Sequence, residues 1–258
     1  MTHFPRSLKN WRAARNLSQL DLALEAQVSA RHISFLETGR ARPSAEMVAR
    51  LSDALRLPLE ARNQLLTQAG FAARYARRDW SDAEMAPIRI AVDALLSNHM
   101  PYPALAIDRL WTIERMNLAA RNLFGHLGIG EGDSLLDLMM SEALPALVEN
   151  WPEVAHHAAL RLRTESIEQG GVPAFDRVVT SLMAQAGRRD APTGPVVPTI
   201  LRLGDVRLSL FVTLAHFGTP EDLSLDDLRI EMYFPMDAET AEVLRAMADG
   251  LPHDGSTV

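Results

Sequence analysis

Residues Leu17–Ser44 read LSQLDLALEAQVSARHISFLETGRARPS, and this stretch carries the start signals of two short helices separated by a tight turn. Ser18 and Asp21 have the spacing of a capping box, in which a hydroxyl and a carboxylate each bond a backbone amide at the start of a helix. Ser29 is the N-cap candidate of the second helix. A helix-turn-helix of this kind places its second helix in the major groove of DNA. The stretch therefore predicts a DNA-binding element.

Apolar residues recur at helical spacing through the same stretch. Leu20, Ala23 and Leu24 predict the buried stripe of the first helix, and Ile33 and Leu36 predict that of the second. Because the side chain of Ala23 is small, the two helices are expected to cross closely.

These residues resemble the helix-turn-helix of the XRE family, the lambdoid-repressor-like transcription factors, over roughly residues 8–68. In that family a Gln opening the first motif helix touches a DNA phosphate, and an Arg of the preceding helix pairs with a Glu that ends the second helix. The resemblance assigns the phosphate contact to Gln19 and the ion pair to Arg12 and Glu37. The chain departs from the family at Gln27, because the turn usually holds Gly. A non-Gly residue in a left-handed conformation there costs about 1 kcal/mol.

Arg31 is the strongest candidate for reading a base, since a guanidinium bonds O6 and N7 of guanine together, a contact worth roughly 1 to 3 kcal/mol of discrimination. The LETGRARPS segment matches the most specific part of the family pattern and implies that Arg40 and Arg42 lie beside the DNA backbone. Phe35 has two interpretations, contact with a thymine methyl or packing into the core, and His32 is expected to be a surface residue. The other residues predicted on the DNA-facing side are Ser29, Ala30, Ser34 and Phe35.

The distribution of charge supports the assignment. Residues Met1–Arg78 contain 13 basic and 6 acidic side chains, a net charge of +7, whereas the whole chain has a net charge of -7, which leaves -14 for the remainder. A basic first third on an acidic remainder is typical of a DNA-binding domain joined to a part that avoids DNA.

Length and composition limit the remaining classes. The 258 residues, 47% of them hydrophobic, suit two globular domains. We predict a DNA-binding domain over 1–78, a second domain over 79–250 and a flexible tail over 251–258. The sequence lacks cysteine, any window near 18 consecutive apolar residues and the pattern of a signal peptide, so we expect a cytoplasmic protein with no disulfide and no membrane partner.

The predicted fold class is α+β: an all-α helix-turn-helix domain of five helices followed by an antiparallel sheet wrapped by helices. The FAARYARRDW segment, residues 71–80, is interpreted as a linker. Besides the two motif helices that start at Ser18 and Ser29, helices are predicted over 5–16, 44–55, 59–69, 83–97, 117–123 and 238–248, with a mostly helical stretch over 135–186 broken at Pro145, Pro152 and Gly170-Gly171. Strands are predicted over 104–108, 111–116, 199–203, 206–215 and 228–234, with a loop over 187–198.

This order, and the stretches PYPALAIDRLWTIERMNLAARNLFG and Asn150-Trp151, resemble the MmyB-like ligand-binding domain, a PAS-like sensor fused to XRE heads, over about residues 83–250. The resemblance implies an internal hydrophobic cavity for a fatty-acid-like or acyl-like molecule. Small-molecule pockets are mostly apolar with a few placed polar groups. The candidate ligand contacts are Tyr102, Trp111, Phe211 and Tyr233 for the wall, and His99, Arg115, Asn117 and His216 for the polar groups. The alternatives are plain core packing for the first four, and surface or capping roles for the others, with Asn117 at an expected N-cap.

Catalytic and metal sites are not expected. Glu153 and His157 share a helix face but lack a third ligand, and the Gly128-x-Gly130-x-Gly132 loop follows a helix rather than a strand. A self-cleaving Ser-Lys dyad is excluded because no lysine follows Lys9. The sequence thus predicts a non-enzymatic transcriptional regulator that binds an operator in double-stranded DNA as a homodimer, needs no cofactor and responds to a small hydrophobic effector. The alternative is a second domain that serves as a ligand-free dimerisation or protein-interaction module.

Overall fold

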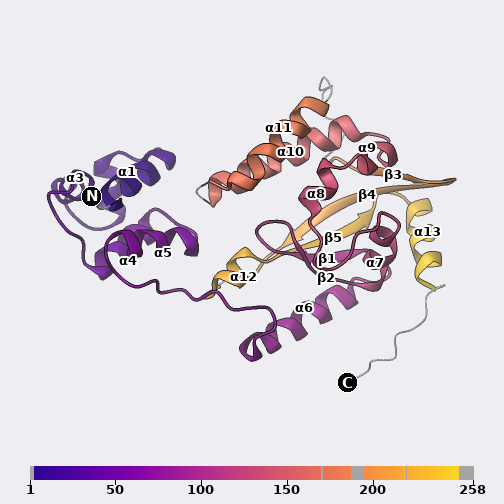
Figure 1. Ribbon diagram of the computed structural model, residues 1–258, viewed down its shortest axis with the longest axis horizontal. Coiled ribbons are helices and arrows are strands. Elements are labelled where there is room, and N and C mark those ends of the chain that lie inside the picture. Colours follow the sequence, from indigo (N-terminus) through magenta and orange to yellow (C-terminus); the bar gives the residue numbers. More distant parts are fainter. Residues whose placement is uncertain (1–2, 170, 187–194, 219, 250–258) are drawn as a thin grey trace. The chain divides into compact units, whose positions relative to one another are not determined.

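The computed structural model describes residues 3–169, 171–186, 195–218 and 220–249. The chain forms two compact units (Figure 1). The first, which we call the head, comprises Met1–Arg78 together with Ile167–Gly171 and Thr219–Asp226, and the second, the sensor unit, comprises the rest. The tail predicted over 251–258 and most of the loop predicted over 187–198 lie outside the described residues.

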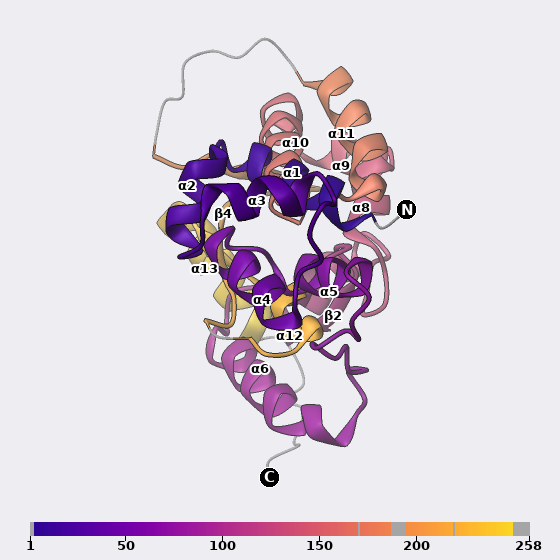
Figure 2. The same cartoon turned by 90° about the vertical axis from the view of Figure 1, so that its left-hand side faces the viewer.

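Five helices form the N-terminal part of the head, as predicted (Figure 2): α1 (Phe4–Ala14), α2 (Gln19–Glu25), α3 (Ala30–Glu37), α4 (Ala45–Ala54) and α5 (Leu59–Gln68). Ser18 and Asp21 form the predicted capping box at α2. The hydroxyls of Ser29 and Ser44 accept hydrogen bonds from the third residue of α3 and of α4. These caps satisfy amides that would otherwise lack a partner, and so fix where the helices begin.

The buried residues of the head differ from the prediction at α2. Leu20 and Leu24 are 58% and 69% exposed, whereas Leu22 and Ala23 are buried, so the stripe predicted for α2 was wrong except at Ala23. In a helix of seven residues, positions 20 and 24 share one face and position 22 lies opposite. Either face fits the apolar periodicity, and packing against the rest of the head decides between them.

The backbone of the turn between α2 and α3 is left-handed at Gln27, the position that usually holds Gly. The φ angle of Gln27 is +52°. Arg50, on α4, holds this turn: its Nη2 donates to the carbonyls of Ala26 at 2.9 Å and of Gln27 at 3.0 Å. These bonds offset the strain that a side chain adds to this conformation.

The sensor unit contains a five-stranded antiparallel sheet in the order β2-β1-β5-β4-β3. Its strands are β1 (Ala104–Ile107), β2 (Ile113–Met116), β3 (Thr199–Leu203), β4 (Val206–Ala215) and β5 (Arg229–Pro235). Its helices are the 3-10 turn η1 (Ala83–Met85), α6 (Ala86–Asn98), α7 (Leu118–Gly125), α8 (Leu135–Met140), α9 (Ala143–Leu147), α10 (Trp151–Glu168), α11 (Pro173–Gln185) and α13 (Ala238–Asp249). The α+β class and the PAS-like sheet wrapped by helices are confirmed.

Two local predictions in this unit were wrong. Trp111 is not in a strand: its φ is +62°, and the second strand begins at Ile113. Pro145 and Pro152 do not break helices, because each lies in the first turn of one, α9 or α10. The missing N–H of proline is tolerated in a first turn, where the amide has no partner in the helix.

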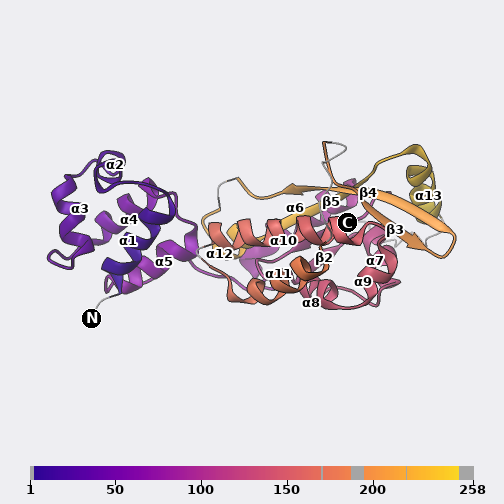
Figure 3. The same ribbon diagram turned by 90° about the horizontal axis from the view of Figure 1, so that it is seen from above.

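The two faces of the sheet pack against different helices, as alternation along a strand requires. On β1, Ala104 and Ala106 belong to a small core with Val92 and Leu96 of α6. Leu105 and Ile107 belong to the main core, with residues of α7, α8, α10 and α11. In Figures 1 and 3, α10 and α11 lie along one side of the sheet and α6 along the other. The sheet is therefore the middle layer of the sensor unit.

The head also includes a piece of chain from the connection between β4 and β5. This connection contains α12 (Leu223–Asp227). Asp226 accepts the N–H of Leu59 at 3.1 Å, at the start of α5, where Pro58 offers no side-chain cap. Asp222 accepts from Nη1 of Arg78 at 2.5 Å. The predicted domain limits did not include this segment in the DNA-binding domain.

Candidate nucleic-acid interface and sensor cavity

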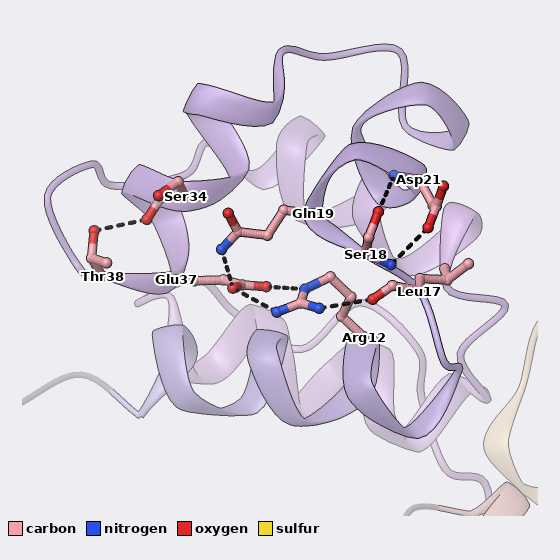
Figure 4. Close-up of polar contacts among 8 residues, drawn as sticks. All are labelled: Arg12, Leu17, Ser18, Gln19, Asp21, Ser34, Glu37 and Thr38. Atoms are coloured by element: carbon pink, nitrogen blue, oxygen red, sulfur yellow. Dashed lines mark hydrogen bonds and ion pairs between the residues drawn. The ribbon is translucent and has the colours of Figure 1, made fainter.

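A buried ion pair joins α1 to α3 (Figure 4). Nε and Nη2 of Arg12 donate to the two carboxylate oxygens of Glu37 at 2.6 and 3.0 Å, and Nη1 donates to the carbonyl of Leu17 at 2.7 Å. The amide of Gln19 donates to the same carboxylate at 2.7 Å. The Glu37 side chain is only 3% exposed. The pair assigned by resemblance is thus present, and it fixes the second helix of the motif against the first helix of the head.

The titration of this pair follows from its contacts. The hydrogen bond to Glu37 raises the pKa of Arg12 above its ordinary value. Burial opposes ionisation of Glu37, but the hydrogen bonds from Arg12 and Gln19 outweigh it and hold the pKa of that carboxyl below its usual value. Both groups are therefore charged at neutral pH.

The N-terminal part of α3 presents Arg31 to solvent. Its guanidinium lies 5.2 Å from the centre of the Phe35 ring, one helical turn away. Phe35 is half-buried and is not among the residues of the head core, which favours its position on the surface of α3 over the core alternative. Ser29 is the exposed N-cap, while Ala30 packs partly against the core. A cation held over a ring has fewer conformations to lose when it binds a base.

The residues predicted to touch the DNA backbone lie on the same motif. Arg40 and Arg42 are exposed on the loop that follows α3. Gln19 is half-buried, and one of its amide hydrogens already bonds Glu37. A backbone contact by Gln19 therefore has to use its other donor. All of these DNA contacts remain predictions.

A cavity of about 340 Å³ lies in the sensor unit, between β3 to β5 of the sheet and the helices α7 to α10. Most of its wall is apolar, and Leu123, Phe124, Leu138, Val154 and Leu210 are among the residues that line it. This size and lining are those of a small-molecule site.

A compact polar group borders the cavity, and four of its five residues, all except Glu165, line the wall. Arg161 of α10 donates from Nε to Glu165 at 2.8 Å and from Nη1 to Glu231 at 2.6 Å, and its guanidinium lies 4.3 Å from the centre of the Trp111 ring. The indole N–H of Trp111 donates to Glu165 at 2.9 Å, and the hydroxyl of Tyr233 donates to Glu231 at 2.9 Å. We call these five residues the polar cluster.

The charges of the polar cluster follow from its contacts. Burial alone lowers the pKa of Arg161, but Glu231 and Glu165 together raise it above the ordinary value. Burial, and then the charge of Glu231, raise the pKa of Tyr233 well above its ordinary value. Arg161 is therefore a cation and Tyr233 a neutral donor at neutral pH.

Only two of the eight predicted ligand contacts, Trp111 and Tyr233, line this cavity. Phe211 lies on the opposite face of the sheet, because it alternates along β4 with Leu210 and Val212, which do line the cavity. It stacks on Phe234 with ring centres 5.4 Å apart. The ring of His99 contacts Phe234 edge to face, with ring centres 4.7 Å apart. Phe211 and His99 thus belong to a half-buried aromatic group with Phe234 and do not line the cavity.

The remaining four predicted contacts lie outside this cavity, and three of them have structural roles elsewhere. Asn117 is the N-cap of α7, accepting from Ala120 at 2.9 Å, so the capping alternative holds for it. Arg115 is in ion pairs with Asp93 and Glu131, and Tyr102 accepts a hydrogen bond from Arg245. The last one, His216, is exposed.

Sequence reasoning missed the charged members of the polar cluster. Arg161 and Glu165 have the (i, i+4) spacing of an ordinary surface pair on a helix. Glu231 offered a usable signal, because it is a charged residue between the apolar residues Ile230 and Met232 of β5. Among the described residues, no group of three or more His, Cys, Asp or Glu side chains is placed to hold a metal ion.

Comparison with known families agrees with this architecture. Residues 88–247, more than half of the chain, match the family described as MmyB-like transcription regulator ligand binding domain. The chain belongs to this family. Residues 8–62 match the helix-turn-helix family, so the MmyB-like regulator joins a DNA-binding head to a ligand-binding sensor unit. Both domains are those of transcription regulators.

Comparison with individual proteins gives no further assignment of fold or function. No curated protein matches the MmyB-like regulator. One solved structure, described as an RNA-binding light-oxygen-voltage receptor, is 13% identical, and the match covers 95% of this chain and 61% of that chain with a TM-score of 0.25. The regulator thus spans less than two thirds of that chain, and a score this low does not establish a shared fold. In the described part of the regulator, every helix is too short or too polar to cross a bilayer.

Proposed function

We propose that this protein is a sequence-specific regulator that binds a DNA operator as a homodimer and changes its affinity when a small hydrophobic effector, fatty-acid-like or acyl-like, enters the sensor cavity. The observation that supports it most directly is an apolar cavity of about 340 Å³ with one polar cluster in its wall. Two heads of a dimer then read half-sites about 34 Å apart. The proposal includes a cytoplasmic location, no catalytic activity and no required cofactor.

The effector acts only through a difference in its affinity for the DNA-competent and DNA-incompetent states. Such coupling is typically about 1 to 3 kcal/mol, or roughly 5- to 150-fold in DNA affinity. The second candidate, a ligand-free dimerisation or protein-interaction module, is supported by the contacts among the half-buried rings of Phe211, Phe234 and His99, which line no part of the cavity. The cavity favours the first candidate. Protein interiors are close-packed and contain few voids larger than a water molecule, so a domain that binds no ligand is not expected to keep an apolar space of this size.

Native mass spectrometry of the purified full chain tests the ligand-binding part of the proposal. We expect a dimer that carries an added mass of a few hundred daltons and loses it on solvent extraction. The extracted protein should bind DNA with an affinity that differs by about 5- to 150-fold from that of the loaded protein. A dimer that stays empty after incubation with fatty acids and acyl thioesters of about 8 to 14 carbons contradicts it and favours the interaction module.

The DNA-reading part is tested at Arg31. We expect Arg31→Ala to relax the base preference at one operator position by about 1 to 3 kcal/mol, because the guanidinium is the group that tells guanine from other bases. Selection of binding sites from a random library measures this directly. Arg6→Ala, which removes an equal charge from an exposed position on α1, is the matched control. An unchanged selected sequence would rule Arg31 out as the reading residue.

A further inference from the structure

Other parts of the chain cover the two outer strands of the five-stranded sheet. Along β3, the N–H of Glu149 donates to the carbonyl of Ile200 at 2.8 Å. Along β2, the N–H of Ile113 donates to the carbonyl of Asp133 at 2.9 Å. A strand whose outer backbone groups are bonded in this way offers no free edge to another strand.

One half of β4 lacks such a cover. The pairing of β3 with β4 ends at Leu210. From Phe211 to Ala215, β4 therefore has β5 on one side and no described strand on the other. We call residues 211–215 of β4 the open edge.

The hydrogen bonds of Tyr233 show which backbone groups face away from β5. Its N–H donates to the carbonyl of Pro103 at 3.0 Å, and its carbonyl accepts from Nε2 of His99 at 2.8 Å, so both groups point away from β4. In an antiparallel pair of this type the opposite residue also turns its backbone groups outward. That residue is Val212, and Leu214, two positions on, has the same orientation. The open edge therefore presents two N–H and two C=O groups.

The side chains of this part of β4 do nothing to prevent pairing. Residues 208–215 read LSLFVTLA and contain no charged residue and no proline. Val212 and Leu214 are exposed although both are apolar. Edge strands that stay single usually carry a Lys, a Pro or a bulge. The open edge is therefore suited to pair with a further strand.

The open edge is complementary to a second copy of itself. In an antiparallel pair centred on Thr213, Val212 lies opposite the partner's Leu214. Each of the two pairs formed in this way exchanges two N–H···O bonds, so all the outward backbone groups are satisfied. The exposed apolar side chains then meet across the strands, and no like charges face each other, because the segment is uncharged.

We propose that the open edge is the dimer interface of this protein, in which β4 pairs antiparallel with β4 of a second copy about a two-fold axis at Thr213. The same surface of each copy forms the contact, as a two-fold dimer requires. This inference rests on the homodimer of the proposed function and names the surface that forms it.

Cross-linking through one introduced cysteine tests the register. The chain contains no cysteine, so a single new thiol cross-links only to the same position of another copy. The two Thr213 α-carbons are expected about 4.5 Å apart, a separation that a disulfide spans. We expect full-length Thr213→Cys to form a covalent dimer under mild oxidation at least about tenfold faster than Val206→Cys. Val206 is the matched control, because it is exposed on the same strand but lies outside the open edge.

Charge substitutions test the pairing without a covalent bond. Thr213→Lys places two cations opposite each other, and Thr213→Glu places two anions there. Analytical ultracentrifugation of either full-length variant should show a dimer dissociation constant raised at least about tenfold. An equimolar mixture of the two should return to within about threefold of wild type, because opposite charges then face each other.

Thr213 suits this test because, unlike Val212 and Leu214, it does not line the sensor cavity. Val206→Lys and Val206→Glu are the matched controls and should leave the dissociation constant unchanged. Circular dichroism shows whether each variant is folded. If the charged variants fail to fold, the Thr213→Cys cross-link decides the question.

The outcomes separate this inference from the proposed function. A wild-type dimer that folded Thr213→Lys leaves unchanged, or that Thr213→Cys cross-links no faster than Val206→Cys, overturns the open edge as the interface and leaves the homodimer in place. If the wild-type protein is a monomer at micromolar concentration, the interface and the homodimer fail together, and the edge is left to a strand of another protein. Effector binding, measured by native mass spectrometry, stands or falls separately.

Discussion

Replacing Glu37 with Ala is expected to lower the free energy of unfolding of the head by about 3 kcal/mol at pH 7. The substitution removes both carboxylate oxygens that bond Arg12, one of which is also the acceptor of Gln19, and leaves a mostly buried guanidinium without its counter-charge. Hydrogen exchange of the α1 and α3 amides, followed by mass spectrometry, measures the loss in the head itself.

Asp53→Ala is the matched control for Glu37. Asp53 also pairs with an arginine, Arg62, but its side chain is 67% exposed. A surface pair of this kind contributes about 0 to 1 kcal/mol. Equal losses in the two variants would contradict the structural role of the Arg12 and Glu37 pair.

The difference between wild type and Glu37→Ala should depend on pH in one direction. The folded-state pKa of Glu37 lies below its unfolded value of about 4.3. The stabilisation is therefore fully present above that unfolded value, and it is lost as the pH falls through the lower, folded value. The two proteins should converge in stability in acid and differ most near neutral pH. A difference that grows as the pH falls would contradict this sign.

Raising the salt concentration from 50 to 200 mM is expected to weaken operator binding on the order of 100-fold. If Arg40 and Arg42 of both heads in the proposed dimer each neutralise one phosphate, log K falls with log salt at a slope of about -0.9 per contact. Four contacts give about -3.6, which over a fourfold change in salt is roughly 150-fold. Binding to the selected operator, followed by fluorescence anisotropy across a salt series, measures the slope.

The double substitution Arg40→Ala and Arg42→Ala isolates this effect. We expect its slope to be shallower by about 3.6, with the base preference unchanged, because phosphate contacts carry no direct sequence information. Arg202→Ala with Arg207→Ala removes the same charge from the sensor unit and should keep the original slope. A slope that the Arg40 and Arg42 substitutions leave intact would show that other residues meet the backbone.

The sequence predicted the parts of the fold that depend on local chemistry. Ser18, Ser29 and Ser44 mark helix starts because each hydroxyl satisfies an amide within three residues. Short strand-like runs predicted the sheet, and four of the five strands begin within one residue of the predicted start, the exception being the second, which begins at Ile113. The buried face of α2 was different, because Leu20 and Leu22 are equally apolar and only the packing of other helices chooses between them.

The sensor site was harder to predict than the head. Its polar cluster joins Trp111, Arg161 and Glu231, which lie far apart in the chain and follow no short motif. Aromatic residues such as Phe211 were equally plausible, because composition does not show which face of a strand a residue occupies. The motif of the head, by contrast, is contiguous, so its resemblance assigned Arg12 and Glu37 to the pair that the structure contains.

The first turn of α5 depends on a carboxylate that is encoded far from it. Asp226 accepts the amide of Leu59 across 167 positions of sequence, and β5 begins three residues later at Arg229. The carboxylate is therefore supplied by the connection between β4 and β5. A chain cut after Arg78 keeps every residue of the five helices but loses this acceptor. The head as a folding unit is therefore not one continuous stretch of the sequence.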